Sequence, residues 1–289
     1  GQRLVERGGR GSRLSDAGRI LAGRAGQALA ALGAGEEELD ALAGLQSGTI
    51  HLGASTVSGV YLLPETLGCF RADFPGVSVQ VEIASSGEIV ERLLAGRIQL
   101  AIIGASAVPE RLELEPFLED EIVGIARPGL IRSRRGVVQP GDLHALLLLA
   151  RERGSSTQAL ADAELRAAGV SPAGVWELGS SEAVKRAARA GLGFALSSGY
   201  AVAEEVERGE LERFRLAGRP PLVRQFSVAR LRGRPLSPGE DAFVRTLRRC
   251  CATSALFGGA CVPAPPPAEG RPRAGARGRP ERPVPTSPG

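Results

Sequence analysis

Residues 48–104, GTIHLGASTVSGVYLLPETLGCFRADFPGVSVQVEIASSGEIVERLLAGRIQLAIIG, alternate between two hydrophobic periods. Apolar residues occupy every second position in 77–84, which is typical of a strand, and recur at helical spacing in 86–95. The predicted order is strand, helix, strand, helix and strand, at 49–54, 63–74, 77–84, 86–95 and 100–103. This βαβαβ order predicts an α/β fold with a doubly wound sheet.

The same alternation of strand and helix returns further along the chain. Strands are predicted at 121–126, 146–150, 175–178, 193–196 and 226–230, and helices at 158–168, 181–190, 201–206 and 238–249. Two similar α/β halves joined by crossing strands predict a hinged, two-lobed binder with a cleft between the lobes. We place lobe I at about 48–126 and 211–249, and lobe II at about 127–210.

The first 46 residues have a different pattern. Residues 1–14 predict a small β-hairpin with an arginine-bearing tip. Ser15 is a candidate N-cap for one long amphipathic helix, or for two with a break at residues 33–35, ending near residue 46. Its stripe of Ala and Leu residues predicts pairing between the helices of two subunits. The alternative is a helix that packs on its own domain.

The composition excludes several classes of protein. Hydrophobic residues make up 43% of the 289 residues and charged residues 24%, as in globular proteins, and no apolar run is long enough for a membrane helix. Lys185, the single lysine, is outside any phosphate-binding loop motif, and His51 and His144 lack neighbours at metal-ligand spacing. We therefore expect no cofactor, no metal and no catalysis. The acidic run 119–121 is interpreted as solvated charge in a loop, and Trp176, at the start of a predicted strand, as a packing residue.

Positive charge is concentrated at the two ends of the chain. Residues 1–24 have six arginines against two acids, residues 250–289 have five against two, and the middle is mildly acidic. Nine of the 20 prolines lie in 263–289, so we predict a disordered tail over 250–289. Three of the four cysteines also fall after residue 249, a distribution that predicts neither a disulfide framework nor a zinc site and fits a reducing cytoplasm.

Hydroxyl side chains follow the predicted strands, at the points where helices begin. They are Ser55, Thr56, Ser58, Ser85, Ser86, Ser155, Ser156, Thr157, Ser180, Ser181, Ser197 and Ser198. Strand C-termini of an open α/β sheet form its ligand crevice, and helix N-termini there present free N–H groups to an anion. Each residue alone is better explained as an ordinary N-cap. The set as a whole predicts a polar binding cleft.

Four stretches of this sequence resemble one family, the LysR-type transcriptional regulators. RLVERGGRGSRLSDAGRIL (3–21) resembles the wing of that family's winged helix-turn-helix and the start of its linker helix. The opening of its effector-binding domain is similar to 45–81, and LLAGRIQLAIIG (93–104) is similar to a later segment. SSEAVKRAARAGLGFALSS (180–198) resembles a segment of its second lobe.

The resemblance implies a domain plan and a function. Residues 1–14 would be a wing remnant, 15–46 the linker and dimerisation helix, and 48–249 an effector domain with the two-lobed, type 2 periplasmic-binding-protein-like fold. The function implied is that of a cytoplasmic DNA-binding regulator, a homodimer or homotetramer without membrane contact, with a polar or anionic small-molecule co-inducer in the cleft. The implied effector contacts are Ser55, Thr56, Ser58, Ser86, Gly104, Ser155, Ser156, Thr157 and Ser198.

The wing arginines affect the expected binding of DNA, and two departures from the family pattern affect the expected charge of the effector. Arg7, Arg10 and Arg13 of the wing would contact DNA phosphate. The family's recognition helix precedes the wing, so we expect this chain to be N-terminally truncated and to lack sequence readout. GASTVSGVYLLP and RERGSSTQ favour the branch that includes carbon-fixation regulators. Gln99 stands where the family usually has an aspartate, and Gln158 stands where this branch has an arginine, which argues against a strongly anionic effector.

Three other hypotheses remain at this stage. The first is a periplasmic-type solute-binding protein of a transporter, which the absent export signal and the arginine-rich hairpin disfavour. The second is an enzyme of the same fold, a lyase or a deaminase, which would need an acid/base pair in the cleft. The third is a truncated gene product without activity.

Overall fold

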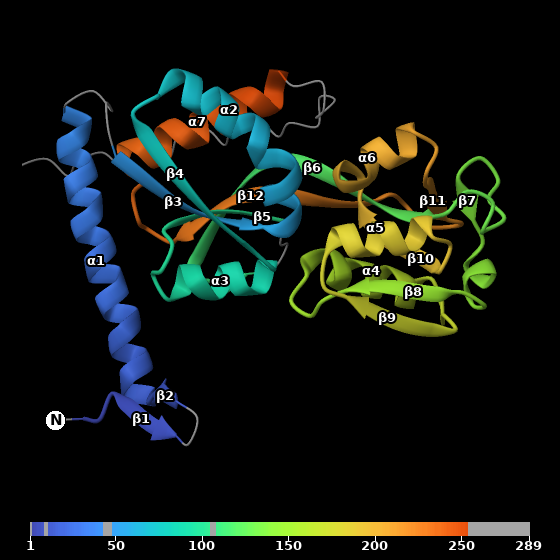
Figure 1. The fold of residues 1–289 in the computed structure, drawn as a ribbon, viewed down its shortest axis with the longest axis horizontal. Helices are drawn as coiled ribbons and strands as arrows, with labels where there is room; N and C mark the ends of the chain where they lie inside the picture. The colour runs from blue at the N-terminus through green and yellow to red at the C-terminus, as the bar shows by residue number, and fades with distance from the viewer. Residues whose placement is uncertain (1, 9–10, 43–47, 105–107, 254–289) are drawn as a thin grey trace, which may run out of the picture.

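Two long antiparallel strands, β6 (Leu112–Ala126) and β12 (Leu222–Leu231), run through both lobes of the body (Figure 1). Their register shifts between Phe226 and Ser227, which pair with Leu118 and Pro116, so β6 has one extra residue, Phe117, at this point. The order of strands is β4-β3-β5-β12-β6-β10-β8-β9, so the crossing pair lies between the two halves of the sheet. These strands are the hinge that the alternating pattern predicts.

The computed structural model describes residues 2–8, 11–42, 48–104 and 108–253. The first lobe consists of β3 (Gly48–Ser55), η1 (Ser58–Leu62), α2 (Leu63–Asp73), β4 (Val77–Ala84), α3 (Ser86–Leu94), β5 (Leu100–Ile103) and α7 (Pro238–Thr253). β3 lies parallel to β4 and β5, as a βαβαβ unit requires. Helices α2 and α7 cover one face of this sheet and α3 the other (Figure 1).

The second lobe repeats this arrangement with shorter strands. It consists of β7 (Val137–Val138), η2 (Pro140–Leu143), β8 (Leu147–Arg151), α4 (Ser156–Ala167), β9 (Gly174–Leu178), α5 (Ser181–Arg189), β10 (Gly193–Ser198), α6 (Gly199–Glu207) and β11 (Glu212–Leu216). β8 is parallel to β9 and β10, and β9 is an edge strand of the sheet.

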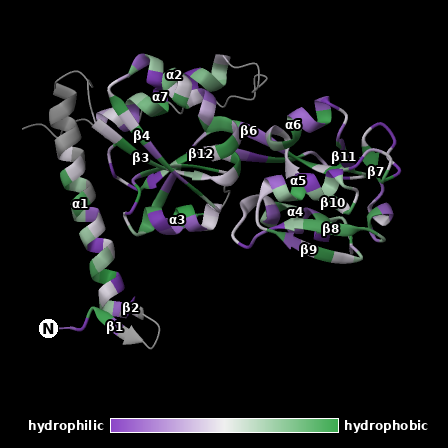
Figure 2. Ribbon diagram, in the orientation of Figure 1, coloured by the Kyte–Doolittle hydropathy of each residue, from purple (hydrophilic) through white to green (hydrophobic). Residues whose placement is uncertain are grey.

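Each lobe has its own apolar core, in agreement with the two-lobed fold predicted from the sequence. Phe70, Phe226 and Phe243 are fully buried in the first lobe, between the sheet and helices α2 and α7. Phe194 and Phe214 pack together in the second, with ring centroids 6.5 Å apart. Figure 2 shows hydrophobic residues along central strands such as β8, with hydrophilic residues on the outer helix faces.

The front of the chain forms the predicted hairpin and long helix. β1 (Val5–Gly8) pairs with β2 (Gly11–Leu14), and the Ser15 hydroxyl accepts a hydrogen bond from the Gly18 amide at 3.0 Å, as an N-cap does. Helix α1 (Asp16–Leu42) then runs beside the first lobe (Figure 1). Gly26 is needed where it crosses the turn after α3, because a Cβ there would lie 2.8 Å from the carbonyl oxygen of Ala95. Within the described residues, no helix has the length and hydropathy needed to span a membrane.

Four details of the sequence-based prediction are wrong. β6 begins at residue 112, so the acidic run 119–121 lies in a strand and not in a loop. β11 was not predicted, and because its Phe214 packs in the second lobe, the lobe I boundary at 211 is too early. Helix α7 continues to Thr253, so the tail does not begin at residue 250. Trp176 of the edge strand β9, expected to pack inside, is 50% exposed.

Candidate functional site

A polar cavity lies between the lobes, where the predicted hydroxyl residues come together. It is lined by Ser55, Thr56, Val57, Ser85, Ser86, Arg151, Ser155, Ser156, Thr157 and Arg224. Its volume is about 10 Å³, the room that about one water molecule needs. Six of the nine residues predicted to contact an effector line this cavity.

The other three predicted residues lie just outside it. The Ser58 hydroxyl donates to the Ile102 carbonyl oxygen at 2.6 Å, so it ties η1 to the sheet. Ser198 donates to the Asp120 carboxylate at 2.9 Å. Gly104 lies against Arg224, and a Cβ at this glycine would come within 3.2 Å of the guanidinium. These positions support the cavity wall and do not line the cavity.

Helix N-termini surround the cavity, as the sequence predicts. The Ser85 hydroxyl accepts from the Glu88 amide at 3.3 Å and Glu88 reaches back to the Ser85 amide at 3.1 Å, which makes a capping box at the start of α3. Ser155 caps α4 in the same way, accepting from the Gln158 amide at 3.3 Å. The hydroxyls of Ser85 and Ser155 are therefore N-caps and cavity-lining groups at once, and for these two residues the two interpretations do not exclude each other.

Arg224, which the sequence did not point to, is the most buried cation of the cavity. Its side chain donates to the Asp120 carboxylate at 2.8 Å and to the Thr157 and Ser156 hydroxyls at 2.8 and 3.2 Å. The guanidinium carbon lies 4.8 Å from the centre of the Phe226 ring. Arg224 is 4% exposed, and its Nη2 atom is buried without a hydrogen-bond partner among the described residues.

Arg151 is the second cation, and it connects the lobes. Its guanidinium donates to Thr56 in the first lobe at 3.2 Å and to Ser181 at the start of α5. Glu152 accepts two hydrogen bonds from Arg151, at 2.6 and 2.7 Å. Arg151 is the first residue of the RERGSSTQ stretch and the last residue of β8. This position at the C-terminal end of a strand could have identified it from the sequence as a cavity residue. Gln158 accepts from the Arg151 amide at 2.8 Å and is not itself among the cavity-lining residues.

The electrostatics of this cavity are dominated by burial. Burial raises the pKa of the Asp120 carboxyl, and the Arg224 charge opposes that shift only in part. Burial also lowers the pKa of Arg224, against the attraction of Asp120. Two guanidiniums and the positive ends of α3, α4 and α5 meet here, while two carboxylates, Asp120 and Glu152, balance the arginines. An anion at this point would therefore be stabilised without any new protein charge.

The lobes contact each other around the cavity. The hydroxyls of Ser86 and Ser156 are 3.0 Å apart across the crevice, and the Gly87 amide donates to the Gly154 carbonyl oxygen at 3.2 Å. Since the enclosed volume holds about one water molecule, any larger ligand enters only when the lobes move apart. Strands β6 and β12 are the covalent connections about which such a movement turns.

A second contact between the lobes involves the single lysine. Tyr61 of η1 donates to Glu182 of α5 at 2.6 Å, and Lys185 lies 5.1 Å above the Tyr61 ring. Lys185 forms ion pairs of 2.7 Å with Glu182 and with Glu205. Burial and then the hydrogen bond to Glu182 raise the pKa of Tyr61 to about 12, so the hydroxyl stays protonated and donates at neutral pH. We name these four residues the tyrosine latch.

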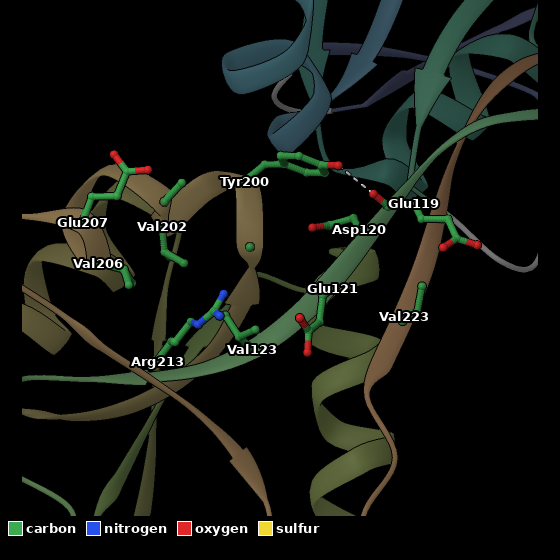
Figure 3. A pocket seen from close by; sticks show the side chains of 12 residues that line it. Glu119, Asp120, Glu121, Val123, Tyr200, Val202, Val206, Glu207, Arg213 and Val223 are labelled. Carbon is green, nitrogen blue, oxygen red and sulfur yellow. Dashed lines mark hydrogen bonds between the residues drawn. The ribbon is translucent and has the colours of Figure 1, made fainter. Parts of the chain in front are cut away.

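A larger hollow lies between α6 and the crossing strands, separate from the cavity (Figure 3). Its volume is about 610 Å³. Valines form much of its wall, including Val123, Val202 and Val206, and carboxylates such as Glu207 lie at its edge. We name it the α6 groove. Within the described part of the chain, no group of three or more His, Cys, Asp or Glu side chains could hold a metal ion.

The structure describes only part of the predicted phosphate-binding set. Arg13 of β2 is 81% exposed and pairs with Glu6 at 3.0 Å. The side chain of Arg7 and all of Arg10 lie outside the described residues. The predicted DNA contacts of these arginines therefore remain predictions.

The model of the LysR substrate binding domain matches residues 43–252 of this chain. The chain belongs to the LysR family. A probable RuBisCO transcriptional regulator of Porphyra purpurea is 35% identical to this LysR-family chain over 212 residues, which cover 71% of the chain and 67% of the relative. One from Trichormus variabilis is 32% identical over 214 residues, 72% and 64% respectively. The chain thus spans about two thirds of the length of these curated relatives.

Solved LysR-family structures have the same two-lobed fold. The CcmR regulatory domain of Synechocystis PCC6803, solved in complex with 2-PG, is 28% identical with a TM-score of 0.64, and the match covers 70% of this chain and 97% of that one. A full-length OxyR variant of Pseudomonas aeruginosa, 16% identical, gives a TM-score of 0.66 over 91% of this chain and 84% of its own. The chain therefore has the effector-binding domain of a LysR-type transcriptional regulator. The relatives give no support to the alternative of a transporter's solute-binding protein.

Proposed function

We propose that this LysR-type regulator senses a small anion, which binds in the cavity between Arg151 and Arg224. The observation that supports this most directly is the buried Nη2 of Arg224, which finds no partner among the described residues. A buried cationic donor without an acceptor costs free energy that a bound anion returns. Although Gln158 replaces an arginine, these two other arginines provide positive charge for an anionic effector.

The hydroxyls of the cavity complete the anion site. Ser55, Thr56, Ser85 and Ser86 line it from the first lobe, and Ser155, Ser156 and Thr157 from the second. Hydroxyls donate hydrogen bonds to a phosphate or carboxylate without adding charge, and the helix N-termini behind them favour negative charge. A ligand that contacts both lobes stabilises the lobe separation at which it is held, so it shifts the population of the regulator toward that separation.

Glu152 is a built-in competitor for this ligand. It occupies two donors of Arg151, and it is the less buried of that pair. A ligand anion would take over those donors while Glu152 turns to solvent. We therefore assign Glu152 the role of holding Arg151 in place when the effector is absent.

Calorimetric titration of the full chain tests this proposal. The probes are 2-PG, inorganic phosphate and, as a neutral control, glycerol. The two anions should bind and glycerol should not. Glu152→Gln should bind the anions severalfold more tightly, because the competing charge is removed. Equal binding of glycerol, or anion affinities that Glu152→Gln leaves unchanged, would overturn the assignment.

The regulator's subunit and DNA contacts are part of the same proposal. Leu29 and Leu32 of α1 are both 68% exposed, and Leu21, on the same side of the helix, is 51% exposed. Such an exposed apolar face supports dimers paired through α1, with tetramers built from them. The exposed Arg13, with Arg7 and Arg10 beside it in sequence, would contact DNA phosphate.

Light scattering tests the dimer. The joint change Leu29→Glu and Leu32→Glu should convert a dimer to a monomer, since four carboxylates would face each other across the paired helices. Arg24→Ala on the same helix is the matched control and should leave the mass unchanged. A wild-type monomer at micromolar concentration would refute the pairing.

The relatives of this chain are transcriptional regulators, and this supports two further inferences. We infer that the chain acts on DNA in the cytoplasm and does not catalyse a reaction. Incubating the chain with 2-PG and recovering it unchanged, as followed by phosphorus magnetic resonance, checks the second point. Release of phosphate at a rate that depends on Arg151 would show an enzyme instead.

A further inference from the structure

Two cysteines meet where the C-terminal helix packs on α2. Cys69 of α2 and Cys250 of α7 are within hydrogen-bonding reach of each other, and both are free thiols in the structure. Figure 1 shows α2 and α7 side by side on the outer face of the first lobe. Neither cysteine is among the residues that line the anion cavity, and neither thiol takes part in the function proposed above.

Neighbouring contacts hold the two thiols in this position. One residue along from Cys69, the Phe70 ring packs edge-on against Phe243 of α7, with centroids 5.4 Å apart. Phe243 lies two helical turns before Cys250, so both face α2. Beside Cys250, Arg249 forms an ion pair with Asp73 at the end of α2.

The two thiols differ in access to solvent, which fixes the order in which they react. Cys69 is partly exposed, whereas Cys250 is 3% exposed. Burial, and then the hydrogen bond with Cys69, raises the pKa of Cys250 to about 12. A buried thiol with a raised pKa is a poor first nucleophile, so Cys69 reacts with an oxidant from solution and Cys250 reacts second.

Cys251 cannot replace Cys250 in this pair. Adjacent residues of a helix point about 100° apart, and Cys251 is buried in the apolar core of the first lobe, in the same cluster as Tyr200. A bond between Cys250 and Cys251 would require the helix to break, because their Cβ vectors diverge. Cys251 is therefore an internal control for any test of the pair.

We infer that Cys69 and Cys250 form a reversible disulfide, a redox modification site that links α2 to α7. The co-reactant is an oxidised low-molecular-weight disulfide. The Cys69 sulfur attacks one sulfur of that molecule and releases its other half as a thiol. The Cys250 sulfur then attacks the Cys69 sulfur and releases the second half. Each cysteine loses one proton and one electron, and the small disulfide is reduced to two thiols.

The bond would fasten the last helix of the domain to its first. It closes a loop that includes the crossing strands and the whole second lobe, so it removes much of the freedom of the unfolded chain. The oxidised chain should consequently melt about 5 °C higher or more than the reduced chain. Anion affinity should stay the same, because the cavity is not touched.

Peptide mapping of the full chain after equilibration in glutathione buffers tests the inference. Cys261→Ser is used as the background, which removes the fourth thiol, and melting confirms that each sample is folded. The expected product is one peptide pair joining Cys69 to Cys250, formed in oxidised glutathione and lost in reduced glutathione. Cys251→Ser should retain this pair and its rise in melting temperature, while Cys69→Ser should lose both.

Two results would overturn the inference. One is alkylation of both Cys69 and Cys250 in the folded chain at the most oxidising buffer. The other is a different linkage, either between Cys69 residues of two chains or with Cys251. Because the anion titration uses reduced protein, a failure there would not affect this result.

Discussion

The cavity between the lobes and the α6 groove differ in size by a large factor, about 10 Å³ against about 610 Å³. The smaller one has two buried guanidiniums, seven hydroxyls and three helix N-termini. The groove is lined by four valines and four carboxylates; among the carboxylates, Glu119 is exposed and Glu121 forms an ion pair with Arg215 at 2.6 Å (Figure 3). Buried cationic donors gathered with hydroxyls and helix N-termini, and not volume, therefore indicate where this protein binds an anion.

Asp120 belongs to both regions, because it lines the groove and holds Arg224 in the cavity, and its loss should have the largest effect. Asp120→Ala should lower the free energy of unfolding by about 3–5 kcal/mol, because it leaves a buried guanidinium unpaired. Thermal melting measures this as a drop of about 10 °C. Glu119→Ala, one residue away and exposed in the groove, should change the melting temperature by less than about 2 °C. Equal effects of the two changes would contradict the comparison.

Removing one guanidinium from the cavity and one from the groove tests which of the two regions binds the anion. Arg151→Ala should weaken binding of 2-PG by about 10- to 100-fold, as expected for lost hydrogen bonds between charged groups. Arg213→Ala removes an exposed cation from the groove and should leave the affinity within twofold. Calorimetry of both variants gives the answer. If Arg213→Ala caused the larger loss, the groove would be the binding site.

Loss of a hydrogen bond in the tyrosine latch should have a smaller effect on anion binding than loss of Arg151. Tyr61→Phe keeps the ring over Lys185 and removes the hydrogen bond to Glu182, so closure becomes less favourable by about 1 kcal/mol. Anion affinity should fall about fivefold, and small-angle scattering of the free protein should show a more open form. Tyr200→Phe, which removes a hydrogen bond to the Glu119 carbonyl oxygen in the groove, should leave affinity unchanged.

Loss of the capping box at the start of α3 should have the smallest effect on the free energy of unfolding, and this effect should depend on pH. The hydrogen bond from the Ser85 amide, and then that from its hydroxyl, holds the pKa of Glu88 below its ordinary value of 4.5. Since the folded-state pKa is lowered, the contribution of Glu88 to stability is complete above the unfolded value and is lost as pH falls through the folded value.

Glu88→Gln should lower the free energy of unfolding by about 0.5 kcal/mol at neutral pH. The difference from wild type should vanish once the wild-type carboxyl is protonated. Urea unfolding at a series of pH values measures it, with Glu207→Gln in the groove as the comparison. A difference that grows as the pH falls would be the wrong sign.

The sequence predicted the hydroxyl wall of the cavity because that wall depends on local order. Ser85 and Ser155 follow a strand and precede a helix, and this order places them at the crevice whatever the rest of the fold does. The repeated alternation of strand and helix in two halves also predicted the two-lobed arrangement, and the family motifs identified the domain. Strand and helix positions followed from hydrophobic period alone, with errors mainly at the ends.

The cations of the cavity could not be predicted in this way. An arginine in a strand, such as Arg224, is usually a surface residue, and an acidic run such as 119–121 is usually solvated. Their meeting depends on the register between β6 and β12, which sets Arg224 opposite Asp120, and no local pattern encodes that pairing. From the sequence, Cys250 and Cys251 were assigned to the disordered tail for a similar reason, because their burial depends on where α2 lies.

The scarcity of aromatic residues has a practical consequence for Trp176, the only tryptophan of the chain. It is half exposed on the edge strand of the second lobe, so its emission reports the surroundings of a single known site. The two tyrosines, Tyr61 and Tyr200, lie on the latch and beside the α6 groove. Excited-state energy passing from Tyr61 to Trp176 would depend on the separation of the lobes. The intrinsic fluorescence of the native chain can therefore report domain motion without an attached dye.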